Sequence, residues 1–270
     1  MSLGIAFKGP EGIVLAADSR VTLTLEQRTP QEKIIVPSTF DNATKLLKIA
    51  DQKYVGVVTY GVGAIGQREP RTAHSYLPEF EDKLSKQNTG RLPVKDFADK
   101  LADFFKEQWA SNMPQDYSGP DMVFLVGGFN DREAYGRIFR IGIPSSPVPE
   151  EQNIGQFGLI WGGQLEFTTR LIKGFDPQLP SMVQGFLGLT DDKRKALERH
   201  LEGGLSSRIP YQFLPLQDCV DLSIFLIRTT MELQTWLVGV RGVGGAIDVA
   251  TITRTDGFNP VQQKRIVARK

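Results

Sequence analysis

The chain has 270 residues, of which 40% are hydrophobic and 23% are charged, as is usual for a globular protein that buries a sizeable core. Its formal net charge of +1 gives no electrostatic basis for binding nucleic acid or an anionic membrane surface. One cysteine, Cys219, excludes a disulfide framework within the chain and a cysteine-rich metal site. The sequence shows no membrane span and no secretory signal, so we expect a cytoplasmic protein without a membrane partner.

The first part of the chain is predicted to form mainly strands. Apolar residues alternate on both sides of the Gly9-Pro10-Glu11-Gly12 turn, which predicts a hairpin. Residues 21–43 are polar and contain two prolines, so they predict a long loop or an extended ribbon. The strands expected in this part cover residues 3–8, 13–18, 45–50 and 53–60.

The rest of the chain alternates between helical and strand patterns. Residues 61–87 read as helical, with Pro70 in a first turn or a kink. Apolar residues at helical spacing predict an amphipathic helix over residues 92–113. The strands expected after it cover residues 122–129, 134–144, 156–163 and 244–254. The helices expected after it cover residues 164–174, 180–187, 191–203 and 217–237.

This order of elements predicts the fold class. Strands, two helices, strands, helices and a final strand suit an α+β, four-layer αββα sandwich, with two mainly antiparallel sheets between helix layers. No repeat or low-complexity linker interrupts the pattern. We therefore expect one domain over residues 1–254, followed by a polar, basic C-terminal tail over residues 255–270.

The segment Gly61-Val-Gly-Ala-Ile-Gly66 allows three interpretations from its sequence. It matches the G-x-G-x-x-G pattern of dinucleotide sites, where glycines let a pyrophosphate approach a helix N-terminus. That fingerprint also needs a second parallel strand after one helix, and here two helices are expected in series. The alternatives are a tight turn without ligand, or backbone N–H groups that stabilise an oxyanion.

An oxyanion site requires a nucleophile, and the start of the chain offers one. Serine is a poor nucleophile unless a base lies within hydrogen-bonding reach. If Met1 is removed, Ser2 carries such a base itself, because its α-amino group has a pKa near 8 in the absence of perturbation. Ser2 would then present a hydroxyl and an amine on adjacent atoms.

The residues around Ser2 resemble the proteasome-type β subunits of the N-terminal-nucleophile hydrolase superfamily. The likeness lies in "SLGIAFKGPEGIVLAADSR", with its sixteen-residue spacing from Ser2 to Asp18, in "TKLLKI" and in "VVTYGVGAIG". The resemblance implies a catalytic set of Ser2, Asp18, Lys45 and Gly61. Ser2 would attack an amide carbonyl, Gly61 N–H would stabilise the oxyanion, and Lys45, held by Asp18, would lower the pKa of the hydroxyl.

The chain departs from that resemblance in three respects. The nucleophile is serine where the family has threonine, and Gly162 occupies the position of a serine. Val240 and Val243 stand where a late Asp and Ser support the terminal amine. These departures bear on catalysis, whereas the fold does not depend on them.

The resemblance implies an N-terminal serine hydrolase that cleaves amide, chiefly peptide, bonds through an acyl-enzyme on Ser2. Its expected partners are a polypeptide or small amide substrate and further copies of itself in a ring-like oligomer; a regulatory ATPase stays unknown. We expect no cofactor and, with two separated histidines, no metal. The alternatives are a catalytically silent proteasome-like scaffold subunit, and a non-peptide amidase or acyl transferase on the same fold.

Overall fold

A computed structural model describes residues 2–28, 33–66, 69–87 and 90–265. It divides into two compact units, of which unit 1 comprises Met1–Gly163 with Tyr211–Lys270, and unit 2 comprises Gln164–Pro210. Among the described helices, none is long and apolar enough to cross a bilayer. The removal of Met1, on which the candidate nucleophile depends, concerns a residue outside the described ranges.

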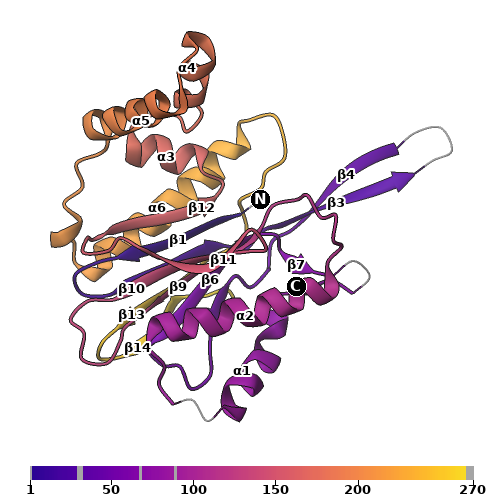
Figure 1. The fold of residues 1–270 in the computed structure, drawn as a ribbon, viewed down its shortest axis with the longest axis vertical. Helices are drawn as coiled ribbons and strands as arrows, with labels where there is room; N and C mark the ends of the chain where they lie inside the picture. Colours follow the sequence, from indigo (N-terminus) through magenta and orange to yellow (C-terminus); the bar gives the residue numbers. More distant parts are fainter. Residues whose placement is uncertain (1, 29–32, 67–68, 88–89, 266–270) are drawn as a thin grey trace. The chain divides into compact units, whose positions relative to one another are not determined.

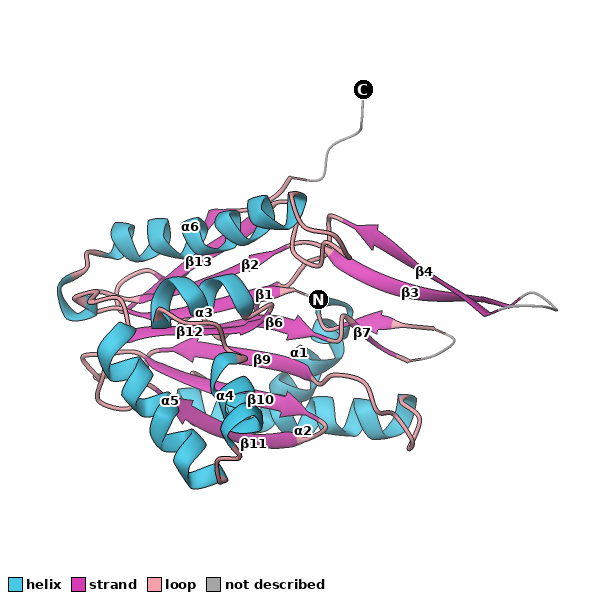
Figure 2. Ribbon diagram, turned by 90° about the horizontal axis from the view of Figure 1, so that it is seen from above, coloured by secondary structure: helices cyan, strands magenta, loops and turns pink. Residues whose placement is uncertain are grey.

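Unit 1 is built around two five-stranded antiparallel sheets (Figures 1 and 2). The first sheet has the order β12 (Gly158–Gly163), β1 (Leu3–Lys8), β2 (Ile13–Asp18), β13 (Ile247–Thr253) and β14 (Gly257–Gln262). The second has the order β11 (Ser146–Gln152), β10 (Arg137–Ile143), β9 (Met122–Gly128), β6 (Val55–Gly61) and β5 (Leu46–Lys48). β1 and β2 are buried along their whole length, because each lies inside its sheet and faces other layers on both sides.

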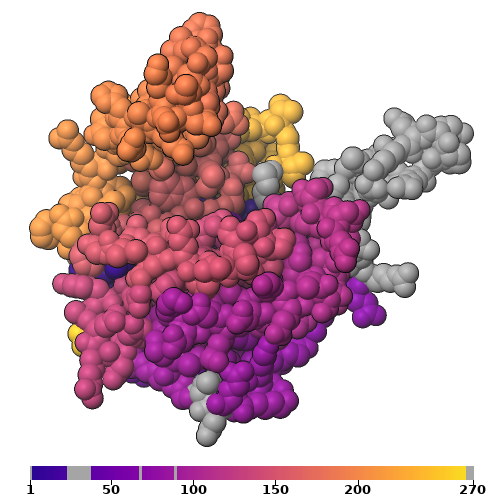
Figure 3. Space-filling model, in the orientation of Figure 1, coloured from indigo at the N-terminus to yellow at the C-terminus, as the bar shows by residue number. Residues whose placement is uncertain are grey.

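Helices cover the outer face of each sheet, which gives the predicted αββα sandwich. α1 (Leu77–Lys86) and α2 (Val94–Asn112) share one hydrophobic core with the sheet of β5, β6, β9 and β10. α6 (Leu216–Thr235) contacts β1, β2 and β13 of the other sheet. A second core, formed by residues of both sheets, fills the space between them. In Figure 3 the purple to magenta surface belongs to α1, α2 and the segments beside them.

The amphipathic pattern over residues 92–113 is confirmed by α2. Its predicted core positions are at most 3% exposed; these residues are Val94, Phe97, Leu101, Phe104 and Phe105. Phe105 stacks on Phe124 of β9 with ring centroids 4.5 Å apart, so this helix face is anchored on the middle of the sheet.

Two short strand pairs flank the candidate site. Within residues 21–43, β3 (Val21–Arg28) pairs antiparallel with β4 (Lys33–Phe40), which is the extended ribbon that the sequence predicted as one option. The helix expected over residues 61–87 is wrong in its first half. The described residues of that half include β7 (Ala64–Ile65), which pairs antiparallel with β8 (Arg71–Thr72), and the 3-10 turn η1 (His74–Tyr76). α1 begins only at Leu77, where Pro78 can occupy the first turn because it needs no N–H donor there.

Two further differences concern strands. β11 is not expected from the sequence, and residues 257–262, which were expected in the C-terminal tail, form β14. β14 pairs with β13 at the edge of the first sheet, and Pro260 is tolerated because one side of an edge strand needs no ladder donors. The short 3-10 turn η2 (Tyr211–Phe213) leads into α6.

Unit 2 contains α3 (Glu166–Lys173), α4 (Leu179–Leu187) and α5 (Asp191–Leu205), close to the three helices expected there. Thr190 caps α5 by accepting a hydrogen bond from Lys193 N, and glycines end the other two helices in left-handed conformations. An ion pair joins Lys173 of α3 to Glu202 of α5.

Candidate active site

Ser2 lies directly before β1 and is buried, with 5% of its surface exposed. β1 is the second strand of its sheet and pairs with β2 on one side and with β12 on the other, where Leu3 is the register partner of Gly163. Ser2 lines a small hollow of about 20 Å³ together with Lys45 and Gly61. The structure therefore brings three of the four predicted residues to one cavity, and the fourth, Asp18, contacts Lys45 behind it.

Asp18 is the most heavily hydrogen-bonded side chain of this group. It ends β2 and is 1% exposed. Its Oδ1 accepts hydrogen bonds from Lys45 Nζ at 2.7 Å and from Leu3 N at 2.9 Å. Its Oδ2 accepts from Gly244 N at 3.0 Å and from Arg20 N at 3.1 Å. Since four donors surround the carboxylate, its anionic form is well solvated by the protein.

Lys45 directly precedes β5, and its side chain contacts Asp18. Its side chain is 7% exposed, so the ion pair with Asp18 is buried on both sides. Burial lowers the pKa of Lys45, and the nearby Asp18 carboxylate opposes that change. A buried ammonium with a lowered pKa and one carboxylate partner is suited to influence a neighbouring hydroxyl by its charge.

Gly61, the last residue of β6, lines the same hollow. Its φ of +87° lies in the left-handed region, and a Cβ there would meet Asp121 O at 2.0 Å. No residue other than glycine fits this position, because the backbone of Asp121, the residue before β9, lies against it. Gly61 begins the short connection to the β7–β8 hairpin, so the Gly61–Gly66 segment does not open a helix. The geometry expected of a dinucleotide site is therefore missing here.

Arg20 contributes to the site by holding the neighbouring backbone in place. Its guanidinium forms an ion pair with Asp41, with Nε–Oδ1 at 2.5 Å and Nη2–Oδ2 at 2.8 Å. This bidentate pair raises the pKa of Arg20 and lowers that of Asp41. The neighbouring Ser19 is fully buried and donates from Oγ to the carbonyls of Asp41 and Ala246. Together these bonds tie the end of β2 to the loops on either side.

Sequence reasoning missed the part played by the loop before β13. Gly244 donates its N–H to Asp18, and a Cβ on Gly244 would meet the Arg20 guanidinium carbon at 2.4 Å. Val243 is buried and donates from its backbone N to Gln234 Oε1, whereas Val240 is 44% exposed. The loop thus supports Asp18 through a backbone donor, which a search for polar side chains does not detect.

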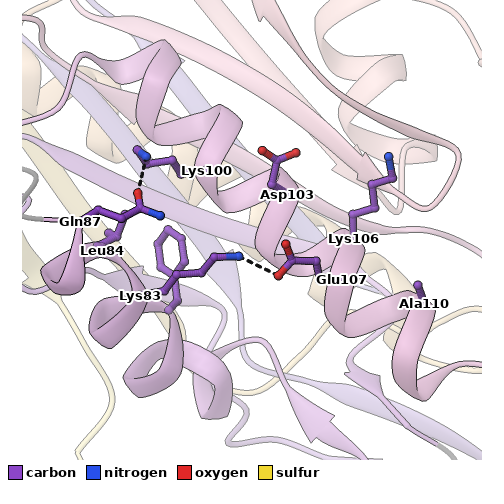
Figure 4. Close-up of a pocket in the computed structure, with 9 residues that line it drawn as sticks. Lys83, Leu84, Gln87, Lys100, Asp103, Lys106, Glu107 and Ala110 are labelled. Carbon is purple, nitrogen blue, oxygen red and sulfur yellow. Dashed lines mark hydrogen bonds and ion pairs between the residues drawn. The ribbon is translucent and has the colours of Figure 1, made fainter.

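A larger hollow of about 500 Å³ lies between α1 and α2 (Figure 4). Its rim carries the Lys83–Glu107 ion pair and a hydrogen bond from Lys100 to Gln87. None of its nine lining residues is a serine, threonine, cysteine or histidine. Within the described part of the chain, no cluster of three or more histidine, cysteine, aspartate or glutamate side chains could hold a metal ion. The hollow at Ser2 is therefore the better candidate for nucleophilic chemistry.

The fold is that of solved Anbu proteins. The chain superposes on Anbu from Hyphomicrobium sp. strain MC1 with a TM-score of 0.53 and 16% identity, covering 99% of this chain and 88% of that one. It matches Anbu (ancestral beta-subunit) from Yersinia bercovieri with a TM-score of 0.55 and 14% identity, covering 97% and 87%. A structure described as the helical assembly of the Anbu complex from Pseudomonas aeruginosa gives 0.57 and 14%, covering 96% and 84%. No protein-family model and no curated protein matches the sequence.

These likenesses show a proteasome-like fold. They also correct the resemblance drawn from the sequence: the assignment to proteasome-type β subunits is wrong, because the similar structures are Anbu proteins, a distinct proteasome-like family. At 14–16% identity the comparison shows the fold alone.

Proposed function

We propose that this chain is an N-terminal serine hydrolase that cleaves amide bonds through an acyl-enzyme on Ser2. The observation that carries the proposal is the convergence of Ser2, Lys45 and Gly61 on one hollow, with the buried Asp18–Lys45 ion pair behind it. Removal of Met1 would free the α-amine of Ser2.

In the proposed reaction, Ser2 Oγ attacks the carbonyl carbon of the substrate amide while its proton moves to the Ser2 α-amine. The N–H of Gly61 stabilises the developing oxyanion, and the Lys45 ammonium stabilises the negative charge on Oγ. The C–N bond then breaks as the amine passes the proton to the leaving nitrogen. Water hydrolyses the resulting ester by the reverse proton path and releases Ser2. Asp18 holds Lys45 charged and oriented through both steps.

The experiment that tests the proposal uses purified full-length protein and a Ser2→Ala variant. Periodate cleaves a vicinal amino alcohol, so it converts an unblocked terminal serine to a glyoxylyl group and lowers the intact mass. We expect that mass change and amide hydrolysis in the wild type, and neither in Ser2→Ala. A free terminal serine with no hydrolysis or acylation by any amide or activated ester would contradict the enzyme proposal.

A second candidate function is a silent scaffold subunit. Val240 and Val243 favour it, because neither offers a hydroxyl or carboxylate to the terminal amine. We also propose that copies of the chain associate, as the Pseudomonas aeruginosa Anbu complex does in its helical assembly. Native mass spectrometry of the wild type and Ser2→Ala measures assembly independently of activity, and both functions predict an oligomer.

A further inference from the structure

The segment after β14 is fixed to the first sheet by a charged side chain, although the sequence predicts a polar tail there. Lys264 binds Asp248 of β13 through two hydrogen bonds: its backbone N donates to Oδ1 at 2.9 Å, and its ammonium donates to Oδ2. Asp248 is 2% exposed, and the Lys264 side chain is 14% exposed. Gln262 adds a hydrogen bond from Nε2 to the carbonyl of Ile247 at 2.7 Å. A largely buried ion pair thus holds this segment on β13.

The register of β13 places this ion pair next to the candidate site. The partner of Asp248 on β2 is Ala17, the residue before Asp18, and Asp18 itself is the partner of Ile247. β5, which directly follows Lys45, contacts both β2 and β13. The ion pair of Asp248 therefore lies one register position from Asp18, in the part of the fold where β2, β13 and β5 meet.

Strand alternation turns Asp248 toward the space between the sheets. Side chains two residues apart on a strand share a face, and Ala250, two residues after Asp248, belongs to the inter-sheet core. Leu46, the residue after Lys45, belongs to the same core. Asp248 and the Lys45 end of β5 thus border the same inter-sheet space.

The charge of Lys264 acts on Lys45. Burial lowers the pKa of Lys45, the Asp18 carboxylate opposes that change, and the cations Lys264 and Arg20 lower the pKa further. The ammonium that the proposed reaction uses therefore lies in the field of one carboxylate and two other cations. Of these cations, Lys264 comes from the C-terminal segment.

The other groups around Lys45 keep their charge at neutral pH. The bidentate ion pair of Arg20 with Asp41 raises the pKa of Arg20 and lowers that of Asp41, which also senses the charge of Lys45. Tyr60 lines the same hollow, and burial raises the pKa of its phenol, so the phenol stays neutral. Once free, the α-amine of Ser2 is the remaining titratable group of the hollow. A changed charge at position 264 should therefore be visible in the titration of Lys45.

We propose that Lys264 is a positioning residue of the site: held by Asp248, its ammonium adds a second positive charge near Lys45 and sets how readily Lys45 keeps its proton. The inference rests on the proposed function, because it matters for catalysis only if the Lys45 cation acts on Ser2. It gives the C-terminal segment a part in the chemistry, since release of Lys264 from Asp248 would change the charge around the nucleophile.

The test is the titration of Lys45, followed by NMR of isotope-labelled lysine side chains in the full-length wild type and in Lys264→Met. Lys45→Met assigns the signal by its loss. Methionine keeps a long apolar stem at position 264 and removes the charge. We expect the midpoint of Lys45 to rise by roughly half to one pH unit in Lys264→Met, because a nearby cation no longer disfavours the ammonium.

Two further variants separate charge from structure. Lys264→Arg keeps the positive charge and can still pair with Asp248, so its midpoint should stay at the wild-type value. The matched control is Lys173→Met, which removes a lysine from the ion pair with Glu202 in unit 2 and should also leave the midpoint unchanged. A wild-type midpoint in Lys264→Met would overturn the inference, even if that variant were less stable. A midpoint in Lys264→Arg as high as in Lys264→Met would overturn it as well.

The titration needs no catalytic activity, so it separates the inference from the proposed function. In a protein that hydrolyses amides, the basic limb of kcat/KM should move up in Lys264→Met together with the Lys45 midpoint, since the cation is the active form. A basic limb that stays in place while the midpoint rises would overturn the role of Lys264 in catalysis. If the wild type hydrolyses no amide and the midpoint still rises in Lys264→Met, the proposed function fails and the coupling between the two lysines stands.

Discussion

Replacing Asp18 with asparagine removes the anion that faces the Lys45 ammonium and leaves most of the surrounding structure in place. The carboxylate accepts four hydrogen bonds, from Lys45 Nζ and from the backbone N–H groups of Leu3, Arg20 and Gly244. An asparagine side chain has one acceptor oxygen, and its NH₂ group would face hydrogen-bond donors where the carboxylate has its second oxygen. The variant therefore leaves a buried cation without its partner and at least one buried N–H without an acceptor.

Loss of one partner of a buried ion pair costs about 3–5 kcal/mol of unfolding free energy. We expect a loss in that range for Asp18→Asn, measured by equilibrium urea denaturation at neutral pH. Because Asp18 is the group that opposes the effect of burial on the pKa of Lys45, the same variant lowers that pKa further. Lys45 then loses its proton at a lower pH, and any hydrolysis falls with it.

The control for this experiment is Asp82→Asn. Asp82 pairs with Lys86 one helical turn away, and both side chains are exposed, at 58% and 74%. Solvent screens such a pair, so its loss should change the unfolding free energy by less than about 0.5 kcal/mol. A loss below about 1 kcal/mol for Asp18→Asn would refute the view that this buried pair holds the site together.

Three further predictions follow from the same geometry. Because burial lowers the pKa of Lys45 and the cation is the active form, kcat/KM should decline with rising pH below the pH at which an ordinary lysine titrates, as a pH–rate profile can show. Gly61→Ala, whose Cβ would overlap Asp121 O, should lower the Tm and abolish acylation. Gly63→Ala, whose Cβ contact is an ordinary 3.4 Å, should keep the Tm within a few degrees. Burial raises the pKa of the Cys219 thiol to about 12, so iodoacetamide should label it in urea and leave the native protein unmodified, as read by intact mass.

The sequence predicted the elements whose patterns reflect burial directly. Both strands of the first hairpin and the helix over residues 92–113 follow from apolar periodicity, and β1, β2 and α2 lie within a few residues of the predicted ranges. β11 could not be recognised, because its sequence SPVPEEQ combines two prolines with acidic residues. It exists as an edge strand paired with β10, a position that tolerates such residues because one side of the strand needs no partner.

The helix expected from residue 61 shows the limit of local pattern. Apolar residues of this segment, such as Ile65 and Ala73, belong to the core under α2. A short strand pair and a helix can both place apolar residues in that core, so the apolar pattern does not distinguish these two structures. At the site, the chemistry of a terminal serine pointed to Ser2, whereas Asp18 and Lys45 were predicted through the resemblance of their surrounding motifs. Gly244 acts through its backbone, and Gly162 leaves the space that the Tyr60 ring occupies, so neither carries a signal in sequence alone.

The most direct measurement of the central claim is the intact mass of the protein after incubation with a small peptide epoxyketone. This reagent reacts with the hydroxyl and the amine of a terminal serine to close one ring, so it reports both atoms together. The account predicts one inhibitor mass added at Ser2 in the wild type, no addition in Ser2→Ala, and much slower addition in Lys45→Ala. An unmodified wild-type protein whose terminal serine is free, or an adduct that persists in Ser2→Ala, would contradict it.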